Sequence, residues 1–311
     1  FSDSTNTLPL GAFSNGTCVP FSGVFHGNGH SIKGLRMSNR FNDGYDDAGF
    51  FCSLMDATVK DLVIDSSCSF IGYYAGALSV RVEGSLTVKN TKNKAVVSGS
   101  YSVGGFIGYV EDLKQQSVVS FDDCVNDGIV TGRSTDVGGF VGLFYNNTDM
   151  SLTISNSINN GIVKSGGNYV GGFVGRAYTN PNMIMTISNV INDGIVSGGN
   201  DYVGGFVGYI YNNTNMTMTI SNSDNNGFIT EGYDWCVGGF VGRVGSNINM
   251  TMTIDGSNNN GFITGSSYIG GFVGDATSNN YMTMTISNST SNAVVTGNNY
   301  VGGVVGRILP S

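Results

Sequence analysis

Charged residues are scarce in this chain, and their scarcity excludes several kinds of partner. Only 12% of the 311 residues are charged, with 14 Lys and Arg against 22 Asp and Glu and a formal net charge of -8. Nucleic acids and anionic membranes attract proteins that present a basic face. Because this composition supplies no such face, we expect no nucleic acid and no anionic membrane as a partner.

Long apolar segments are also missing. A membrane-spanning helix needs about 20 consecutive apolar residues, whereas the apolar runs here are short and interrupted by glycine. We therefore expect no membrane span. The chain begins at Phe1 without an initiator Met, which indicates a mature form or a fragment whose targeting signal is absent from this sequence.

Residues that commonly perform catalysis are few and widely spaced. There are two histidines, His26 and His30, and no nucleophile motif, phosphate-binding loop or zinc-ligand spacing. Asp127 and Asp193 lie in Asn-Asp-Gly corners, where turn chemistry accounts for them. Three basic residues look scattered among loops, namely Arg133, Arg176 and Arg243. Because catalysis needs titratable groups that converge, we predict no enzyme, no catalytic residue, no metal site and no cofactor.

What the chain has in abundance is a repeat of about 33 residues. Blocks of the form Val-Gly-Gly-Phe-Val-Gly begin at Val103, Val137, Val170, Val203, Val237, Ile269 and Val301, after weaker copies at 48–52 and 75–79. A fixed period of this length is typical of solenoids, in which each repeat contacts only its neighbours. We predict one continuous solenoid domain over residues 46–311, preceded by a capping or first-coil region over residues 1–45.

One repeat, residues 203–232, predicts three short strands. Residues 203–210 are β-rich around a glycine pair, residues 216–220 alternate Met and Thr with a period of two, and residues 227–230 form a third strand. The connections are too short for a crossover helix, so each strand should pair in parallel with its copy in the next repeat. Parallel crossovers are right-handed in nearly all cases. The predicted fold is an all-β, right-handed parallel β-solenoid of about nine coils, each of roughly 27–34 residues.

Equivalent residues should stack into columns along such a solenoid. The Met and Ile of the second strand share one face and predict three interior columns: Met183, Met216, Met250 and Met282; Met185, Met218, Met252 and Met284; Ile154, Ile187, Ile220, Ile254 and Ile286. Asparagine pairs fall at one corner of successive coils, where Asn tolerates left-handed backbone and stacked amides can bond along the axis, as at Asn159-Asn160, Asn225-Asn226 and Asn259-Asn260.

Residues 21–35 carry a family resemblance. Their sequence, Phe-Ser-Gly-Val-Phe-His-Gly-Asn-Gly-His-Ser-Ile-Lys-Gly-Leu, resembles the opening coil of GLUG-motif proteins, and the later Gly-Gly-Phe-Val-Gly blocks look like the GLUG motif with Phe where Leu is common. His26 replaces the Asp of the family pattern, and the coils here are longer and richer in Asn. The resemblance implies a pectin-lyase-like right-handed β-helix of secreted or cell-surface proteins, often adhesin-like and without enzymatic activity of its own. It also makes His26 and His30 turn or capping residues.

Six Asn-x-Ser/Thr sequons are present, at Asn15, Asn146, Asn212, Asn215, Asn249 and Asn288. Duplication of an Asn-rich loop would repeat such sequons even if nothing were attached to them. Asn146 and Asn212 both lie nine residues after the Val of their block, and Asn215 and Asn249 both lie twelve after it. These four should therefore line one edge of the rod. We predict N-glycosylation and an extracellular or cell-surface location.

Five cysteines are an odd number. Cys18, Cys52 and Cys68 lie in the less regular N-terminal region, where one disulfide would staple the cap, and the connectivity cannot be read from the sequence. The alternative is that these residues are buried thiols. Cys124 and Cys236 interrupt the repeats singly.

Two outward columns suggest alternative binding functions. The Thr residues of the second strand form a flat array that resembles the ice-contacting face of β-solenoid antifreeze proteins, at Thr217 and Thr219, Thr251 and Thr253, and Thr283 and Thr285. Ser151 and Ile184 interrupt that array, and outward Thr also suits any strand. A tyrosine column could stack on sugars, although an aromatic ladder also stabilises a sheet without a ligand; it comprises Tyr169, Tyr202, Tyr268 and Tyr300.

The ends of a solenoid are open sheet edges, which template pairing with another chain unless they are capped. Residues 1–45 can cap one end, and no cap is visible in residues 307–311 at the other. Either the chain continued beyond Ser311 or the exposed coil meets a partner. We predict a non-enzymatic extracellular structural or surface glycoprotein that self-associates head to tail or laterally. The alternatives are an adhesin-like carbohydrate-binding solenoid and an ice-binding solenoid.

Overall fold

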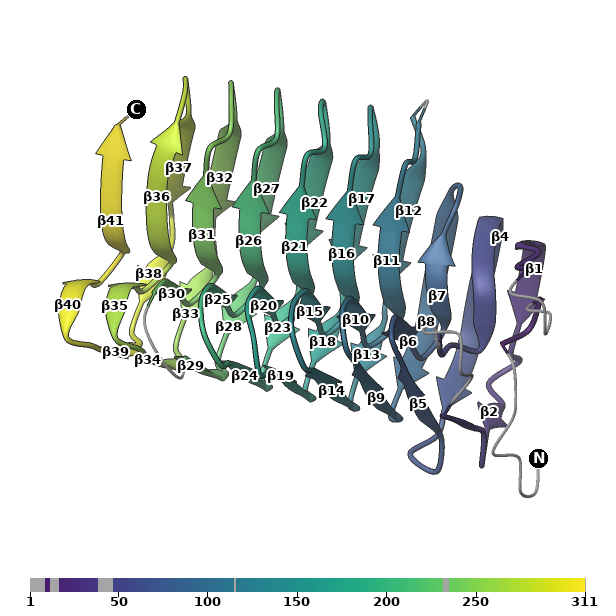
Figure 1. The fold of residues 1–311 in the computed structure, drawn as a ribbon. Coiled ribbons are helices and arrows are strands. Elements are labelled where there is room, and N and C mark those ends of the chain that lie inside the picture. Colours follow the sequence, from purple (N-terminus) through teal and green to yellow (C-terminus); the bar gives the residue numbers. More distant parts are fainter. Residues whose placement is uncertain (1–8, 12–16, 39–46, 115, 232–234, 311) are drawn as a thin grey trace.

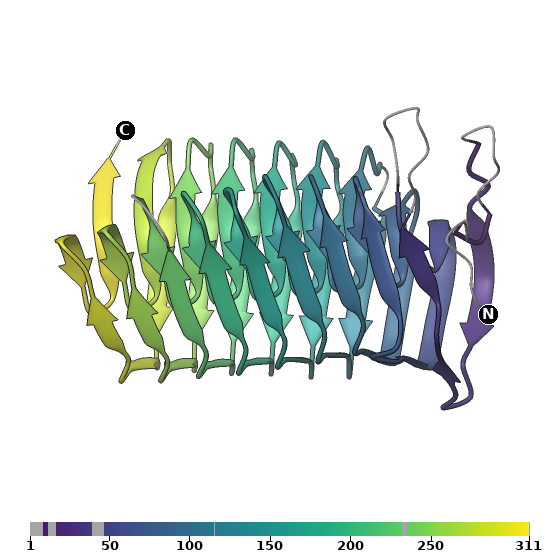
Figure 2. The ribbon, with the colours of Figure 1, turned by 60° about the horizontal axis from the view of Figure 1, so that its bottom comes forward.

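The chain coils into an elongated stack of parallel β-strands, shown in the computed structural model of Figure 1. The structure describes residues 9–11, 17–38, 47–114, 116–231 and 235–310. Within these ranges the regular structure is all β, without a helix. Every strand pairs in parallel with its counterpart in the neighbouring coil, and successive coils lie side by side when the rod is turned (Figure 2). The predicted parallel β-solenoid is therefore confirmed.

Three sheets wrap around the core. A sheet of 24 strands comprises β1 (Phe21–His26), β2 (Ser31–Ile32), β4 (Phe51–Ile64), β7 (Ser79–Val82), β8 (Leu86–Asn93), β11 (Ile107–Glu111), β12 (Val118–Asp122), β13 (Val125–Asn126), β16 (Val141–Tyr145), β17 (Ser151–Ser155), β18 (Ile158–Asn159), β21 (Val174–Tyr178), β22 (Ile184–Ser188), β23 (Ile191–Asn192), β26 (Val207–Tyr211), β27 (Thr217–Ser221), β28 (Asp224–Asn225), β31 (Val241–Gly245), β32 (Thr251–Asp255), β33 (Asn258–Asn259), β36 (Val273–Asn279), β37 (Thr283–Ser287), β38 (Thr290–Ser291) and β41 (Val305–Pro310).

The other two sheets are built from shorter strands. A sheet of eight comprises β6 (Ala75–Gly76), β10 (Val103–Gly104), β15 (Val137–Gly138), β20 (Val170–Gly171), β25 (Val203–Gly204), β30 (Val237–Gly238), β35 (Ser267–Gly270) and β40 (Asn299–Gly302). A sheet of nine comprises β3 (Arg36–Ser38), β5 (Ser69–Gly72), β9 (Val96–Gly99), β14 (Ile129–Gly132), β19 (Ile162–Ser165), β24 (Ile195–Gly198), β29 (Phe228–Glu231), β34 (Phe262–Thr264) and β39 (Val294–Thr296).

The glycine pair of each block turns the chain from one sheet into another. The single strand predicted over residues 203–210 is instead two strands, β25 and β26, which belong to different sheets. A Cβ atom on Gly205, between them, would lie 2.1 Å from the carbonyl oxygen of Gly239 in the next coil. Only glycine permits backbones to approach this closely at a bend. The other two predicted strands of this repeat correspond to β27 and β29.

Methionine and isoleucine fill the interior as predicted, except at the C-terminal end of the three columns, where Met282, Met284 and Ile286 are only partly buried. Met185, Met218 and Met252 face one another in register on β22, β27 and β32, and each is 0% exposed. Burying one such side chain stabilises the fold by about 1.5 to 3 kcal/mol relative to leaving it in water. A further interior column consists of stacked phenylalanines, at Phe106, Phe140, Phe173, Phe206, Phe240 and Phe272.

Two ladders of buried asparagines run parallel to the rod axis. In the first, which we call the corner ladder, each Nδ2 donates to the Oδ1 of the next coil at 2.8 to 2.9 Å, through Asn93, Asn126, Asn159, Asn192, Asn225 and Asn259. The predicted bonding of stacked amides is thus confirmed. A second ladder was not predicted and joins its members at 2.9 to 3.2 Å, through Asn147, Asn180, Asn213, Asn247 and Asn279.

Candidate functional site

A strip of aromatic rings follows the outer side of the rod, and we call it the tyrosine face. Its rings come from two places in the coils. One is in or just before the short strand of the eight-stranded sheet, and the other is the third or fifth residue of the strand that follows. Its members are Tyr73, Tyr74, Tyr101, Tyr109, Tyr145, Tyr169, Tyr178, Tyr202, Tyr209, Tyr211, Tyr268 and Tyr300. Neighbouring rings contact one another, with Tyr145 and Tyr178 stacked at 5.3 Å. The predicted column of four tyrosines is therefore one part of a wider surface.

Arginine side chains lie among these rings, each against a buried carboxylate. Arg176 on β21 places Nε 2.7 Å from Asp136 Oδ1, and its Nη2 donates to Asp136 Oδ2 at 3.0 Å. Its guanidinium also lies over the rings of Tyr169 and Tyr178, at 4.6 and 5.1 Å from their centroids. Burial raises the pKa of Asp136 to about 6, although the Arg176 charge opposes that shift.

A second cluster repeats this arrangement further along the rod. Asp275 on β36 is 0% exposed and contacts two arginines, Arg243 Nε at 3.0 Å and Arg307 Nε at 2.7 Å. Arg243 also donates to the hydroxyl of Tyr202 at 2.6 Å. The interpretation that Arg176 and Arg243 belong to loops is therefore wrong: both lie on strands, in one column. Arg133 lies in a turn, as predicted.

The tyrosine face contains a cavity of about 230 Å³. It is lined by Tyr74, Tyr101, Ser102, Tyr109, Glu111, Leu143, Tyr145, Arg176 and Tyr178. Burial raises the pKa of Tyr74 and of Tyr109, so both phenols remain neutral hydroxyl groups. Burial also raises the pKa of Glu111, helped by the nearby charge of Asp112 and opposed by Arg81. The cavity therefore combines ring faces, hydroxyl groups and one carboxyl group, a combination suited to an uncharged polar ligand.

The predicted glycosylation sites lie at the surface wherever the structure describes them. Four of them occupy the loops before β17, β27 and β32 and are exposed, namely Asn146, Asn212, Asn215 and Asn249. Their side chains bond along the rod: Asn215 Nδ2 donates to Asn182 Oδ1 at 3.0 Å, and Asn249 Nδ2 donates to Asn215 Oδ1 at 2.8 Å. Asn288 follows β37 and is also exposed, whereas Asn15 lies outside the described residues.

The cysteines and histidines of the N-terminal region make contacts that stabilise the fold there. Cys18 and Cys52 form a disulfide, whereas Cys68 is a buried thiol. His26 Nδ1 accepts a hydrogen bond from the Asn28 amide at 3.0 Å, and its Nε2 lies 3.2 Å from an oxygen of Asp61. These contacts hold the turn after β1 against β4.

The threonine array lies on strands β27, β32 and β37, where its residues align in register, Thr217 with Thr251 and Thr219 with Thr253. Ile184, 51% exposed, occupies the same column on β22. The flat array is therefore confined to three coils, and ice binding stays a prediction.

Within the described residues, no helix is long and apolar enough to cross a bilayer. No family model matches the sequence, and no curated protein matches it. The resemblance to GLUG-motif proteins is therefore supported only for its β-solenoid fold.

A solved structure similar to this chain is that of a candidate immunoglobulin A1 protease from Bacteroides ovatus. The two share 20% sequence identity with a TM-score of 0.49, and the match covers 93% of this chain and 74% of the other. This finding contradicts the prediction that the chain is not an enzyme, and we withdraw that prediction. At this identity the protease activity named for the bacterial protein belongs to that protein alone.

Proposed function

We propose that this chain is an extracellular or cell-surface scaffold whose β-solenoid carries N-glycans along one edge. The observation that carries the proposal is the placement of Asn146, Asn212, Asn215 and Asn249, which are all exposed in loops at the same edge of the rod. The disulfide between Cys18 and Cys52 supports it, because disulfides form and persist in oxidising compartments. A regular stack with one glycosylated edge would space other surfaces away from a membrane or matrix.

The edge geometry limits how many of these sites carry glycans together. Asn249 Nδ2 lies 2.8 Å from Asn215 Oδ1 in the next coil. A glycan is attached through Nδ2, so two glycans on these residues would start within one coil spacing, about 5 Å. We therefore expect either Asn215 or Asn249 to be occupied in any one molecule, but not both.

The test is secretion of the chain from a eukaryotic cell line, followed by intact-mass measurement before and after treatment with an N-glycosidase. We expect a mass loss that corresponds to two or more glycans. Thr148→Val removes the Asn146 sequon without altering the asparagine itself, and should remove one glycan. Thr148→Ser keeps the sequon and serves as the matched control. A secreted protein of unmodified mass would overturn the proposal.

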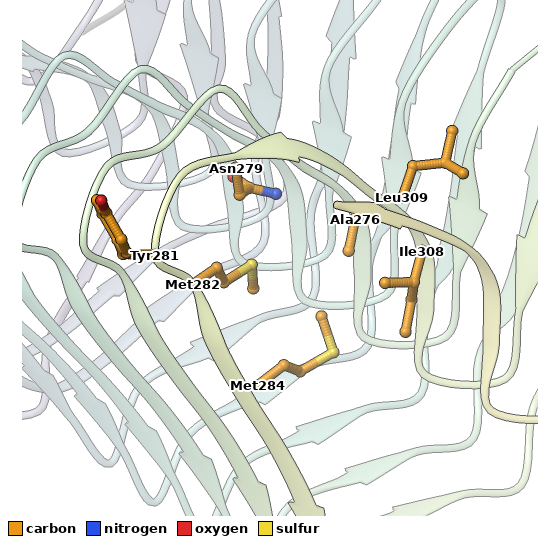
Figure 3. Close-up of a pocket in the computed structure, with 7 residues that line it drawn as sticks. All are labelled: Ala276, Asn279, Tyr281, Met282, Met284, Ile308 and Leu309. Atoms are coloured by element: carbon orange, nitrogen blue, oxygen red, sulfur yellow. The ribbon is translucent and has the colours of Figure 1, made fainter. Parts of the chain in front are cut away.

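We further propose that a second copy of the chain docks end to end on the last coil. Strands β39, β40 and β41 each pair on one side only within the described part of the chain. The core is open here, where a cavity of about 340 Å³ is lined by Ala276, Asn279, Tyr281, Met282, Met284, Ile308 and Leu309 (Figure 3). Ile308 is 62% exposed, although it continues an interior column from Ala276.

The opposite end of the rod offers a complementary edge. Strand β1 pairs only with β4 among the described strands, and Val24 on it is 65% exposed. A head-to-tail contact between these two ends would continue the parallel stacking of the coils. Lateral association would instead use the side of the rod, where Ile184 is 51% exposed.

Two matched substitutions separate these modes in sedimentation velocity and electron microscopy. Ile308→Asp places a charge in the open end and should abolish concentration-dependent association. Ile184→Asp places the same charge on the side and should leave end-to-end association intact. The reverse pattern would show lateral contact, and a wild-type protein that stays monomeric at all concentrations would show that neither mode occurs.

A further inference from the structure

The cavity of the tyrosine face is bounded by two sets of rings. On one side Tyr74 and Tyr109 meet at 4.8 Å between centroids, and on the other Tyr145 and Tyr178 stack at 5.3 Å with planes 17° apart. These rings come from successive coils, so the cavity spans several repeats of the rod. An elongated site of this kind suits a chain-like ligand better than a compact one.

The arginines around this cavity already pair with carboxylates of the protein. Arg176 lies in the wall, but its guanidinium makes two contacts with Asp136, at 2.7 and 3.0 Å, and is only 18% exposed. On the other side, Arg81 Nε lies 2.6 Å from Glu83 Oε1. An anionic ligand would therefore have to displace an existing ion pair, which is costly for a buried carboxylate such as Asp136. The site favours a ligand without net charge.

Hydroxyl groups are the polar atoms that remain available. The phenols of Tyr74 and Tyr145 can each donate and accept a hydrogen bond, whereas the Tyr109 hydroxyl already accepts one from Arg81. Glu111 adds a carboxyl group at the same wall. Sugars present two kinds of surface, apolar C–H faces and a rim of hydroxyls. Ring faces with hydroxyl and carboxyl groups at their edges complement both surfaces.

We propose that this cavity binds an uncharged oligosaccharide, with sugar rings lying against the tyrosines and sugar hydroxyls bonded to Glu111. This ligand site goes beyond the proposed scaffold role and does not depend on it. The stacked rings continue from Tyr145 through Tyr178 to Tyr211, with the second pair 5.6 Å apart. Because this row places three rings in successive coils, longer oligosaccharides should bind more tightly than single sugars.

The test is isothermal titration of the 311-residue chain with a panel of uncharged hexasaccharides: cellohexaose, xylohexaose, mannohexaose and chitohexaose. We expect at least one of them to bind, and its monosaccharide to bind about tenfold more weakly or worse. Tyr145→Ala and Glu111→Gln should each weaken binding by about tenfold. Phe228→Ala is the matched control, because that ring is 40% exposed and lies on β29, in the nine-stranded sheet, away from the cavity.

Two further ligands separate this proposal from its competitors. Oligogalacturonate hexamer tests for an anionic sugar site, and a proline decamer tests for peptide docking on aromatic rings. The proposal is overturned if every hexasaccharide fails to bind at millimolar concentration, if either of these two ligands binds more tightly than all four, or if Phe228→Ala weakens binding as much as Tyr145→Ala. Thermal unfolding of each variant must match the wild type, and Tyr145→Phe supplies a ring-retaining variant if Tyr145→Ala does not fold.

Discussion

Adjacent asparagines at one corner of the solenoid make the same bond in different surroundings. Asn225 Nδ2 donates to Asn259 Oδ1 at 2.8 Å inside the rod, and Asn226 Nδ2 donates to Asp193 Oδ1 at 2.8 Å on its surface. Asn225 is 0% exposed, whereas Asn226 is in contact with water. Water can replace a lost partner at the surface but not in the interior. Burial, not bond length, therefore decides what each asparagine contributes to stability.

The carboxylates show the same contrast between interior and surface. Burial raises the pKa of Asp136 to about 6. The exposed carboxylate of Asp255 accepts hydrogen bonds from Ser287 Oγ at 2.7 Å and Asn288 Nδ2 at 2.8 Å, and these bonds lower its pKa. The pKa of an aspartate is thus raised in the interior and lowered at the surface by its surroundings.

Breaking the corner ladder should have the largest effect. Asn225→Leu keeps the side-chain shape but leaves the Nδ2 of Asn192 and the Oδ1 of Asn259 without their ladder partner. Each buried group left unsatisfied costs about 1 to 3 kcal/mol, so we expect the free energy of unfolding to fall by about 4 kcal/mol. Urea unfolding, monitored by circular dichroism, measures this loss in the free energy of unfolding. A loss below about 1 kcal/mol would show that the interior tolerates unpaired amides.

The pH dependence of stability should reveal the buried carboxylate of Asp136. Its folded pKa is raised, so the folded protein holds this proton more tightly than the unfolded chain does. The free energy of unfolding should therefore fall as the pH rises from about 4 to about 6, and then level off. A pKa raised from 3.8 to about 6 corresponds to a decrease of about 3 kcal/mol in the free energy of unfolding over this pH range.

Asp136→Asn is the control for this pH dependence, because the amide does not titrate. The difference between wild-type and variant unfolding free energies should change across that pH range and be constant above it. Identical pH profiles for the two proteins would contradict the raised pKa.

Periodicity was enough to predict the fold. The spacing of the Val-Gly-Gly-Phe-Val-Gly blocks gives the coil length, and the alternation of Met218 and Thr219 gives the inner and outer faces, because a strand reverses its side chains at every residue. Columns within one strand are therefore readable from the sequence. The structure places Met218 at 0% exposure, as predicted.

How the different strands of one coil lie relative to one another could not be predicted from this periodicity. The division of residues 203–210 into β25 and β26 depends on how closely Gly205 approaches the next coil. The same holds for the second asparagine ladder, since Asn147 and its counterparts sit in loops that look uniformly Asn-rich in the sequence. Burial of one Asn among several is decided by the path of the loop.

The tyrosine cavity was missed for the same reason. Tyr74 precedes β6 and Tyr109 lies on β11, so that nothing in their spacing shows that their rings meet at 4.8 Å. Arg176 and Asp136 are separated by 40 residues along the chain and paired across coils. The signal that could have found them was the phase of Arg176 and Arg243, which both stand at the third residue of their strands.

The surface member of the asparagine pair provides the smaller counterpart to the ladder substitution. Asn226→Leu removes the bond to Asp193 and the bond that Asn260 Nδ2 donates to Asn226 Oδ1, but water then solvates both partners. Surface substitutions of this kind usually change stability by less than about 0.5 kcal/mol, so we expect little change in urea unfolding. A loss as large as that of Asn225→Leu would show that the position in the coil, not burial, decides the cost.

The smallest effect should be at Asp255, on the surface at the end of β32. Its lowered pKa means that its hydrogen bonds to Ser287 and Asn288 favour folding above the ordinary pKa of 3.8, and that this contribution is lost as the pH falls through the folded value. Asp255 is partly exposed, so solvent screens the interaction. A carbon-detected NMR titration should place the Asp255 midpoint below 3.8, and Asn288→Ala should raise it. A wild-type midpoint at or above 3.8 would mean that hydrogen bonds on this surface do not shift a carboxylate, and that burial alone separates Asp136 from Asp255.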